Sequence, residues 1–293
     1  MGTVRCLGCK GRRVRCRSFK EDELRLISLT PLRIPALREI VACITFDVIK
    51  QDCVHLLSEL PQDMPTIVPL TSEAEWLPAF VDLADYELPF VPTIVLAPHP
   101  DDETLGAGGL ITKLRRAGVP VTIVAITDGE NAYAGTHRLG DIRVLEQTEA
   151  VQRLGVPEHM IHRLHLPDRD VSDYEDQLVE RLLPLVTADV HLVAPWQRDF
   201  HPDHEAAGRA AARVAQANNL PITYYLFWTW HRGNPSILDE LPMTKLRLTE
   251  AELTSKLHAL QAYVSQFEHG DGQPILSPEL LVPAQRAFEV YIR

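Results

Sequence analysis

Three features are scarce in this chain of 293 residues: cysteine, long hydrophobic stretches and positive charge. The five cysteines all lie within the first 53 residues, and an odd number without a secretory signal argues against a disulfide framework. No stretch approaches the roughly 20 apolar residues that a membrane helix needs. The formal net charge is −11, which disfavours nonspecific binding to nucleic acid or to an anionic membrane. With 45% apolar residues, the composition is that of an ordinary globular protein.

Residues 1–87 are predicted to form an N-terminal extension of unknown role. The first 20 residues are basic and rich in cysteine, which indicates either disorder or a start codon placed too far upstream, with Met64 as the alternative start. No apolar segment follows the basic residues, so no secretory signal is expected and a cytoplasmic location is the default. The Cys-x-x-Cys pair Cys6 and Cys9 suggests a zinc knuckle, but a structural zinc needs four ligands, and free thiols are the simpler interpretation.

Residues 88–293 are predicted to form one α/β domain. Short apolar runs that are typical of buried strands occupy residues 93–97, 121–126 and 190–194, and further strands are predicted at 161–166 and 222–227. Helical spacing occupies residues 105–117, 141–154, 174–186, 204–218 and 249–267. Strands that alternate with helices predict a mostly parallel sheet with helices on both faces.

The segment Ala97-Pro-His-Pro-Asp-Asp-Glu103 follows the first predicted strand of this domain and precedes a helix. Open α/β sheets bind ligands at the carboxyl ends of their strands, so the segment lies where chemistry is expected. His99 and Asp102 are three residues apart and can both reach one cation, which leaves Asp101 free to act as a base. The alternative is that the acidic residues only favour a helix start through its dipole. The small residues Gly106-Ala-Gly-Gly109 allow the backbone to approach the site or the sheet closely.

A second polar cluster, Trp196-Gln-Arg-Asp-Phe-His-Pro-Asp-His204, follows the strand predicted at 190–194. His201 and His204 are three residues apart, so one histidine can bind a metal while the other faces the substrate. A lone histidine is more often a structural residue. Two histidines in a His-x-x-His pattern, at the same topological position as the first motif, favour a metal site.

The residue types in the two motifs suit metal-dependent hydrolysis. Two histidines and one carboxylate are a common catalytic zinc set, which leaves a coordination position open for water. Zinc lowers the pKa of bound water to about 7, and Asp101 can take the proton. His201, if protonated, can stabilise the oxyanion and donate to the leaving amine. Iron can replace zinc because their affinities for nitrogen and oxygen ligands overlap.

The paired motifs resemble those of the LmbE-like, or PIG-L, de-N-acetylases, a family that includes the N-acetylglucosaminyl-phosphatidylinositol deacetylase. The resemblance covers residues 90–293. Further segments agree with it: Thr127-Asp-Gly-Glu130, Arg143-x-x-Glu146, Lys256 and Tyr263-x-Ser-Gln266. Pro98 departs from the family pattern, which usually has no proline between the alanine and the histidine.

The resemblance implies a Rossmann-like fold and a single zinc ion. Its implied ligands are His99, Asp102 and His204, with Asp101 as the general base and His201 as the electrophilic acid. The implied reaction is hydrolysis of an N-acetyl group on an N-acetylglucosamine-type sugar or glycoconjugate, which releases acetate and a free amine. The implied partner is therefore a small-molecule N-acetylated sugar conjugate.

By the same resemblance, Arg143 is expected to bind the sugar. The segment Trp228-Thr-Trp-His-Arg232 follows a predicted strand, so it either lines the sugar site or packs in the core. Asp168 and Asp170 also follow a predicted strand and are predicted to lie in an exposed acidic loop. Two other functions stay open: a metal hydrolase of another amide or ester, and a non-catalytic Rossmann-like sugar-binding module that holds no zinc.

Overall fold

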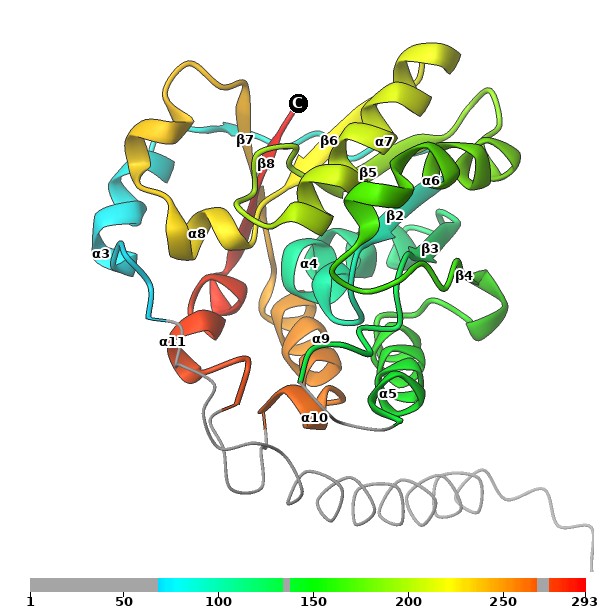
Figure 1. Cartoon of the computed structure of the whole chain (residues 1–293). Coiled ribbons are helices and arrows are strands. Elements are labelled where there is room, and N and C mark those ends of the chain that lie inside the picture. The colour runs from blue at the N-terminus through cyan, green and yellow to red at the C-terminus, as the bar shows by residue number, and fades with distance from the viewer. Residues whose placement is uncertain (1–67, 134–137, 268–273) are drawn as a thin grey trace, which may run out of the picture. The chain divides into compact units, whose positions relative to one another are not determined.

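The computed structural model describes residues 68–133, 138–267 and 274–293 (Figure 1). All of them lie within the unit Ile49–Arg293. The cysteine cluster and residues 1–67 of the predicted extension lie outside the described residues.

The described strands form one sheet in the order β1-β7-β8-β6-β5-β2-β3-β4. Strands β6, β5, β2, β3 and β4 pair in parallel, whereas β8 runs antiparallel to both β6 and β7, and β1 is parallel to β7. The predicted mostly parallel sheet is thus confirmed. The strands are β1 Ala84–Asp85, β2 Thr93–Ala97, β3 Val121–Ala125, β4 Ile161–Arg163, β5 His191–Pro195, β6 Ile222–Tyr225, β7 Met243–Arg247 and β8 Phe288–Ile292.

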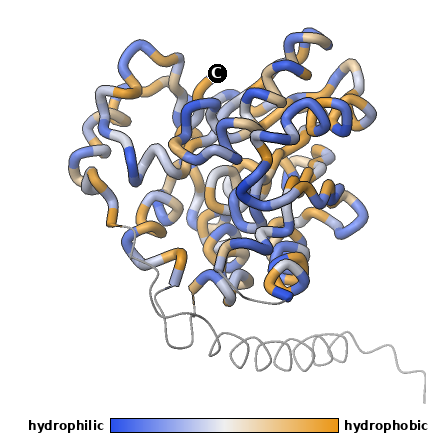
Figure 2. The backbone as a smooth tube through the Cα atoms, in the orientation of Figure 1, coloured by the Kyte–Doolittle hydropathy of each residue, from blue (hydrophilic) through white to orange (hydrophobic). Residues whose placement is uncertain are grey.

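Helices cover both faces of the sheet. Side chains alternate across a strand, so Ile94 and Leu96 contribute to one hydrophobic cluster with α6 and α7, while Val95 contributes to the other with α4, α5 and α9. The helices alternate between hydrophilic and hydrophobic segments, as expected when one side faces the sheet and the other faces water (Figure 2). The helices are α3 Glu73–Trp76, α4 Asp102–Arg116, α5 Leu139–Arg153, α6 Glu175–Leu182, α7 Pro202–Asn218, α8 Trp228–Arg232, α9 Glu250–Leu260, α10 Val264–Phe267 and α11 Pro278–Leu281. Among the described helices, none has both the length and the apolarity to cross a bilayer.

The five predicted strands are confirmed as β2 to β6, whereas β7 and β8 are additional strands that the apolar pattern of the sequence does not predict. Each of these strands contains a buried charged residue, which interrupts the apolar pattern. Lys245 of β7 donates its Nζ to the carbonyl of Phe80 at 2.6 Å. The carboxylate of Glu289 in β8 accepts hydrogen bonds from two backbone N–H groups of α4, from Lys256 and from the Tyr291 hydroxyl. A charged residue can be buried in a strand when it has hydrogen-bond partners, and such a strand is then not predicted from a run of apolar residues.

The prediction of one continuous helix over residues 249–267 is wrong. Helix α9 begins at the predicted Thr249 capping box and ends at Leu260, and a separate short helix α10 begins at Val264. The break follows from tertiary contacts rather than from a glycine or proline. The Tyr263 hydroxyl donates to the buried Glu103, and the backbone and hydroxyl of Ser265 donate to Glu146 at 2.7 and 2.6 Å.

Residues 68–87, which were assigned to the extension, pack against the sheet. Trp76 of α3 donates its Nε1 to the carbonyl of Trp230 at 3.0 Å, and their rings meet edge to face at 5.1 Å. Arg286 forms two hydrogen bonds with Glu73, at 2.8 and 2.7 Å. The described part of the predicted extension therefore contributes α3 and β1 to this fold, and an extension over residues 1–67 stays a prediction.

The small residues at the start of α4 allow a close approach, as predicted. A Cβ at Gly106 would lie 2.2 Å from the ring of Tyr225, so the helix contacts the sheet at this point. Further along, the Glu289 carboxylate accepts the backbone N–H groups of Gly109 and Leu110 at 2.7 and 2.8 Å. Lys256 of α9 donates to that carboxylate at 2.7 Å, which joins α4, α9 and β8 through one buried ion pair.

Candidate metal centre and active site

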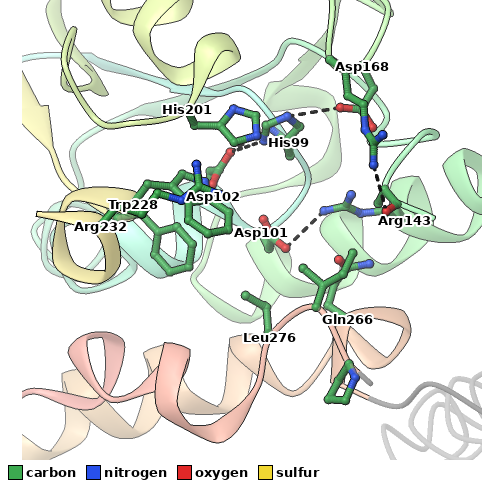
Figure 3. Close-up of a pocket in the computed structure, with 15 residues that line it drawn as sticks. His99, Asp101, Asp102, Arg143, Asp168, His201, Trp228, Arg232, Gln266 and Leu276 are labelled. Carbon is green, nitrogen blue, oxygen red and sulfur yellow. Dashed lines mark hydrogen bonds and ion pairs between the residues drawn. The ribbon is translucent and has the colours of Figure 1, made fainter. Parts of the chain in front are cut away.

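The two sequence motifs meet because β2 and β5 are parallel neighbours in the sheet. The loop after β2 carries His99, and the turn after β5 leads to His201 and His204. Both segments thus lie at the carboxyl ends of their strands, at the same edge. The structure brings together segments that are about a hundred residues apart, in the arrangement that the sequence analysis expected (Figure 3).

His99, Asp102 and His204 form a compact cluster of possible metal ligands. One ligand atom from each lies within 4.8 Å of the others. Asp102 Oδ2 lies 3.1 Å from His99 Nδ1 and 3.2 Å from His204 Nε2. A second grouping, His99 with His201 and Asp203, also meets this geometric test, but both oxygens of Asp203 already accept backbone N–H groups, at 2.8 and 3.2 Å.

The first cluster fits a divalent metal in its donor atoms as well as in its spacing. His204 Nε2 is buried and has no hydrogen-bond partner among the described residues. A buried polar nitrogen without a partner is costly, and a cation would satisfy it. Two imidazoles and a carboxylate are the ligand types that zinc takes in catalytic sites.

Each ligand histidine has carboxylates at its other ring nitrogen. His204 Nδ1 lies 2.9 Å from Asp199 Oδ2. His99 Nε2 lies 3.1 Å from Asp203 Oδ2 and 3.3 Å from Asp168 Oδ1. Carboxylates in this position fix the tautomer and the orientation of a ligand ring. Burial lowers the pKa of His204, but the charges of Asp102 and Asp199 outweigh it and raise the pKa to about 9.

The prediction of an exposed loop at Asp168 is wrong. Asp168 is 3% exposed and contacts His99, and its other oxygen accepts the backbone N–H of Asn131 at 2.9 Å. Burial opposes ionisation of Asp168, but its bonds to His99 lower its pKa to about 2. Its position after β4, at the same sheet edge as the motifs, is the sequence signal that could have revealed it.

Asp101 is the N-cap residue of α4, lies at the cavity and is 5% exposed. Its backbone has φ 128°, a conformation that is rare and costly for a residue other than glycine. Burial raises the pKa of Asp101 to about 8, while the charge of Arg143 acts in the opposite direction. A cation bound nearby would act in the same direction as Arg143 and favour the carboxylate form.

Arg143 of α5 points into the cavity beside Asp101 (Figure 3). Its guanidinium donates to Asp101 Oδ2 at 3.2 Å and to the carbonyls of Pro100 and Gly129 at 2.7 and 3.1 Å. Gly129 is required at its position, because its φ is +63° and a Cβ would lie 2.2 Å from the Arg143 guanidinium. The arginine therefore supports the loop that carries Asp101, in addition to facing the cavity.

His201 caps α7 and contacts the cavity from the opposite motif. Its Nδ1 accepts the backbone N–H of Asp203 at 3.3 Å, which places the ring proton on Nε2. Burial, together with the positive charges of His204 and His99, lowers the pKa of His201 to about 2. The structure favours the neutral form of His201, which acts as a hydrogen-bond donor through Nε2–H.

A cavity of about 190 Å³ opens above the cluster. Its walls include Trp228 and Arg232 of α8. The guanidinium carbon of Arg232 lies 4.3 Å from the centre of the Trp228 ring. Leu276 contributes an apolar wall on the side of α11 (Figure 3). The two outcomes considered for residues 228–232 both occur, since Trp228 lines the cavity while Trp230 packs in the core against Trp76.

The chain is similar to several known deacetylases. Residues 94–215 match the family described as GlcNAc-PI de-N-acetylase, PIG-L. The probable N-acetyl-alpha-D-glucosaminyl L-malate deacetylase 2 of Bacillus cereus is 29% identical over 192 residues, which cover 60% of this chain and 83% of that protein. The 1D-myo-inositol 2-acetamido-2-deoxy-alpha-D-glucopyranoside deacetylase of Nocardia farcinica is 39% identical over 163 residues, which cover 45% of this chain and 54% of that protein. A solved deacetylase from teicoplanin biosynthesis shares the fold, with a TM-score of 0.57 at 16% identity over 69% of this chain and 96% of that one.

Proposed function

We propose that the chain is a zinc-dependent hydrolase that removes the acetyl group from an N-acetylglucosamine-type sugar or glycoconjugate, and the match of residues 94–215 to the PIG-L family supports this. The observation that carries the proposal is the convergence of His99, Asp102 and His204 below a cavity that Asp101 also lines. The named activities of the two relatives support the same reaction class, since both act on an N-acetylated glucosamine derivative.

The proposed metal ligands are His99 Nδ1, one Asp102 oxygen and His204 Nε2. When bound, a zinc ion would activate water and polarise the amide carbonyl of the substrate. The carboxylates at the remote nitrogens of both histidines hold the rings in the orientation that ligation needs. Iron is the alternative metal for the same ligand set.

The remaining residues supply proton transfer and orientation. Asp101, held by Arg143, is the proposed general base that takes a proton from the attacking water and then gives it to the nitrogen of the leaving amine. Neutral His201 is placed to donate its Nε2–H to the oxygen on which negative charge develops. Arg143, whose guanidinium faces the cavity, is the proposed contact to the sugar. Trp228 offers an aromatic face on the cavity wall against which the sugar can pack.

The proposal is tested by an amine-release assay over a panel of N-acetylglucosamine conjugates, with and without a chelator. We expect release that stops when the metal is removed and returns with zinc. In Asp101→Asn we expect turnover to fall about 10²- to 10⁴-fold while zinc stays bound, because only the base is lost. The matched control is Asp189→Asn, an exposed aspartate away from the cavity, which should retain wild-type turnover.

Two outcomes would count against the proposal. Full turnover in Asp101→Asn would remove this residue from the mechanism. A zinc-loaded protein that cleaves other amides or esters but none of the acetylated sugars would replace the substrate class with the broader metal-hydrolase alternative.

A further inference from the structure

Asp199 is a fully buried carboxylate in the turn between β5 and α7, and the sequence motif gave it no role. Its Oδ2 lies 2.9 Å from His204 Nδ1 and accepts the backbone N–H of Trp228 at 3.1 Å. Its Oδ1 accepts the backbone N–H and the hydroxyl of Thr229, at 2.9 and 2.6 Å. The N–H of Phe227 lies 3.2 and 3.3 Å from the two oxygens. One carboxylate thus joins a metal-ligand histidine to the segment that begins α8.

The first contact determines which ring nitrogen of His204 carries the proton. A carboxylate accepts hydrogen bonds and does not donate them, so His204 Nδ1 must be the protonated nitrogen. In the neutral ring that binds a metal, Nε2 then carries no proton and keeps its lone pair for the metal. This Nε2 is buried without a hydrogen-bond partner among the described residues and lies 3.2 Å from Asp102 Oδ2. Asp199 therefore holds His204 in the tautomer that a metal ligand requires.

The remaining contacts fix the aromatic wall of the cavity. The N–H groups of Trp228 and Thr229 belong to the first turn of α8, where a short helix has no internal acceptors. Trp228 lines the cavity and stacks on His201, with ring centres 5.7 Å apart and planes 20° apart. Arg232, one turn later, also lines the cavity. The position of this wall depends on the same side chain that orients His204.

We propose that Asp199 is a positioning residue that sets the tautomer of His204 and fixes the start of α8, so that metal binding and substrate binding depend on one buried carboxylate. The inference rests on the proposed function for its substrate readout, but its metal readout is independent of turnover. Asp199 does not line the cavity, so it acts through His204 and Trp228 and not by touching the substrate.

The test is Asp199→Asn in the full chain, which replaces one acceptor oxygen by an amide that donates. If the amide faces His204, the ring must shift to the Nε2–H tautomer; if it faces Thr229, the start of α8 loses an acceptor. We expect zinc affinity, measured by competition with a chromophoric chelator, to fall about 10- to 100-fold. We also expect KM to rise, and circular dichroism to show that the fold is kept.

The matched variant is Thr229→Val, which removes only the 2.6 Å hydroxyl bond and leaves the His204 contact intact. We expect its zinc affinity to stay close to wild type. If Asp199→Asn does not fold, ¹⁵N NMR of the zinc-loaded wild-type protein gives the answer directly. The expected spectrum has His204 protonated on Nδ1, and protonation on Nε2 would overturn the proposal.

The two proposals fail in different ways. If the wild-type protein binds zinc but releases no amine, while Asp199→Asn still weakens zinc binding, the deacetylase proposal fails and the metal-positioning role of Asp199 stands. If the wild-type protein deacetylates and Asp199→Asn has wild-type zinc affinity and KM, Asp199 has no positioning role.

Discussion

The buried ion pair between Lys256 and Glu289 leads to a quantitative prediction about stability. The side chains of both residues are at most 4% exposed, and the carboxylate also accepts two backbone N–H groups of α4 and the Tyr291 hydroxyl. Lys256→Met keeps most of the side-chain volume but leaves the glutamate charge without its cation. Breaking a buried pair from one side costs about 3–5 kcal/mol, since the remaining charge stays desolvated.

The loss should be measured as the free energy of unfolding in urea at neutral pH, together with the thermal midpoint. A folded unit of this size loses about 2–4 °C per kcal/mol, so we expect the midpoint to fall by about 6–20 °C. Adding Glu289→Gln to Lys256→Met removes the uncompensated charge and should restore part of the loss.

Lys113 of α4 provides the control, because its pair with Glu252 at 2.8 Å lies nearer the surface, with side chains 18% and 10% exposed. Lys113→Met should cost only about 1 kcal/mol or less. The reasoning is refuted if Lys256→Met costs no more than Lys113→Met, or if adding Glu289→Gln destabilises Lys256→Met further.

Three further outcomes are expected. His204→Ala should lower the zinc content measured by mass spectrometry of the purified protein, whereas the exposed His159→Ala should not; unchanged metal in the first variant would discard that ligand. Gly106→Ala should lose about 1–3 kcal/mol of unfolding free energy because its Cβ would meet the buried Tyr225 ring, and wild-type stability would show that the contact is easily relieved. Burial, with the charge of Arg293, lowers the pKa of His191 to about 4, so its native form is neutral and the unfolded state takes up the proton first as pH falls. The contribution of neutral His191 to the free energy of unfolding is complete above pH 6.5, and about 3 kcal/mol of it is lost between pH 6.5 and pH 4. Urea titrations over this pH range should show a smaller loss of stability in His191→Gln than in the wild type, and an equal loss would exclude His191 as the cause.

Most of the parallel half of the sheet could be predicted from the sequence because β2, β3 and β5 are almost wholly buried. The run Thr93–Ala97 is apolar apart from its threonine, whose hydroxyl donates to the nearby carbonyl of Val91 at 3.0 Å. Strands β7 and β8 could not be found in this way, because Lys245 and Glu289 are paired with groups far away in sequence. The same holds for the end of α9, where Tyr263 leaves the helix to meet Glu103.

In the candidate site, the metal ligands could be predicted from the sequence, whereas the carboxylates that support them could not. His99 and Asp102 could be predicted from the sequence because they lie three residues apart in one short motif. His204 could be placed near them because ligands of α/β sheets bind at the carboxyl ends of the strands, and β2 and β5 are parallel neighbours. The supporting carboxylates have no such local signature. Asp168 reaches His99 from a different strand, and Asp199 binds Thr229 across thirty residues of sequence, so only the folded chain shows what they do.

The place of β8 in the sheet has a consequence for how the protein assembles during synthesis. This strand lies between β6 and β7, and among the described strands it alone links β1 and β7 to the parallel half. Residues 288–292 emerge from the ribosome after every other strand, so the nascent chain must hold β7 without a lateral partner on that side until they arrive. The same delay leaves Lys256 without its glutamate, so the buried ion pair between α9 and β8 is among the last contacts of the sheet to form.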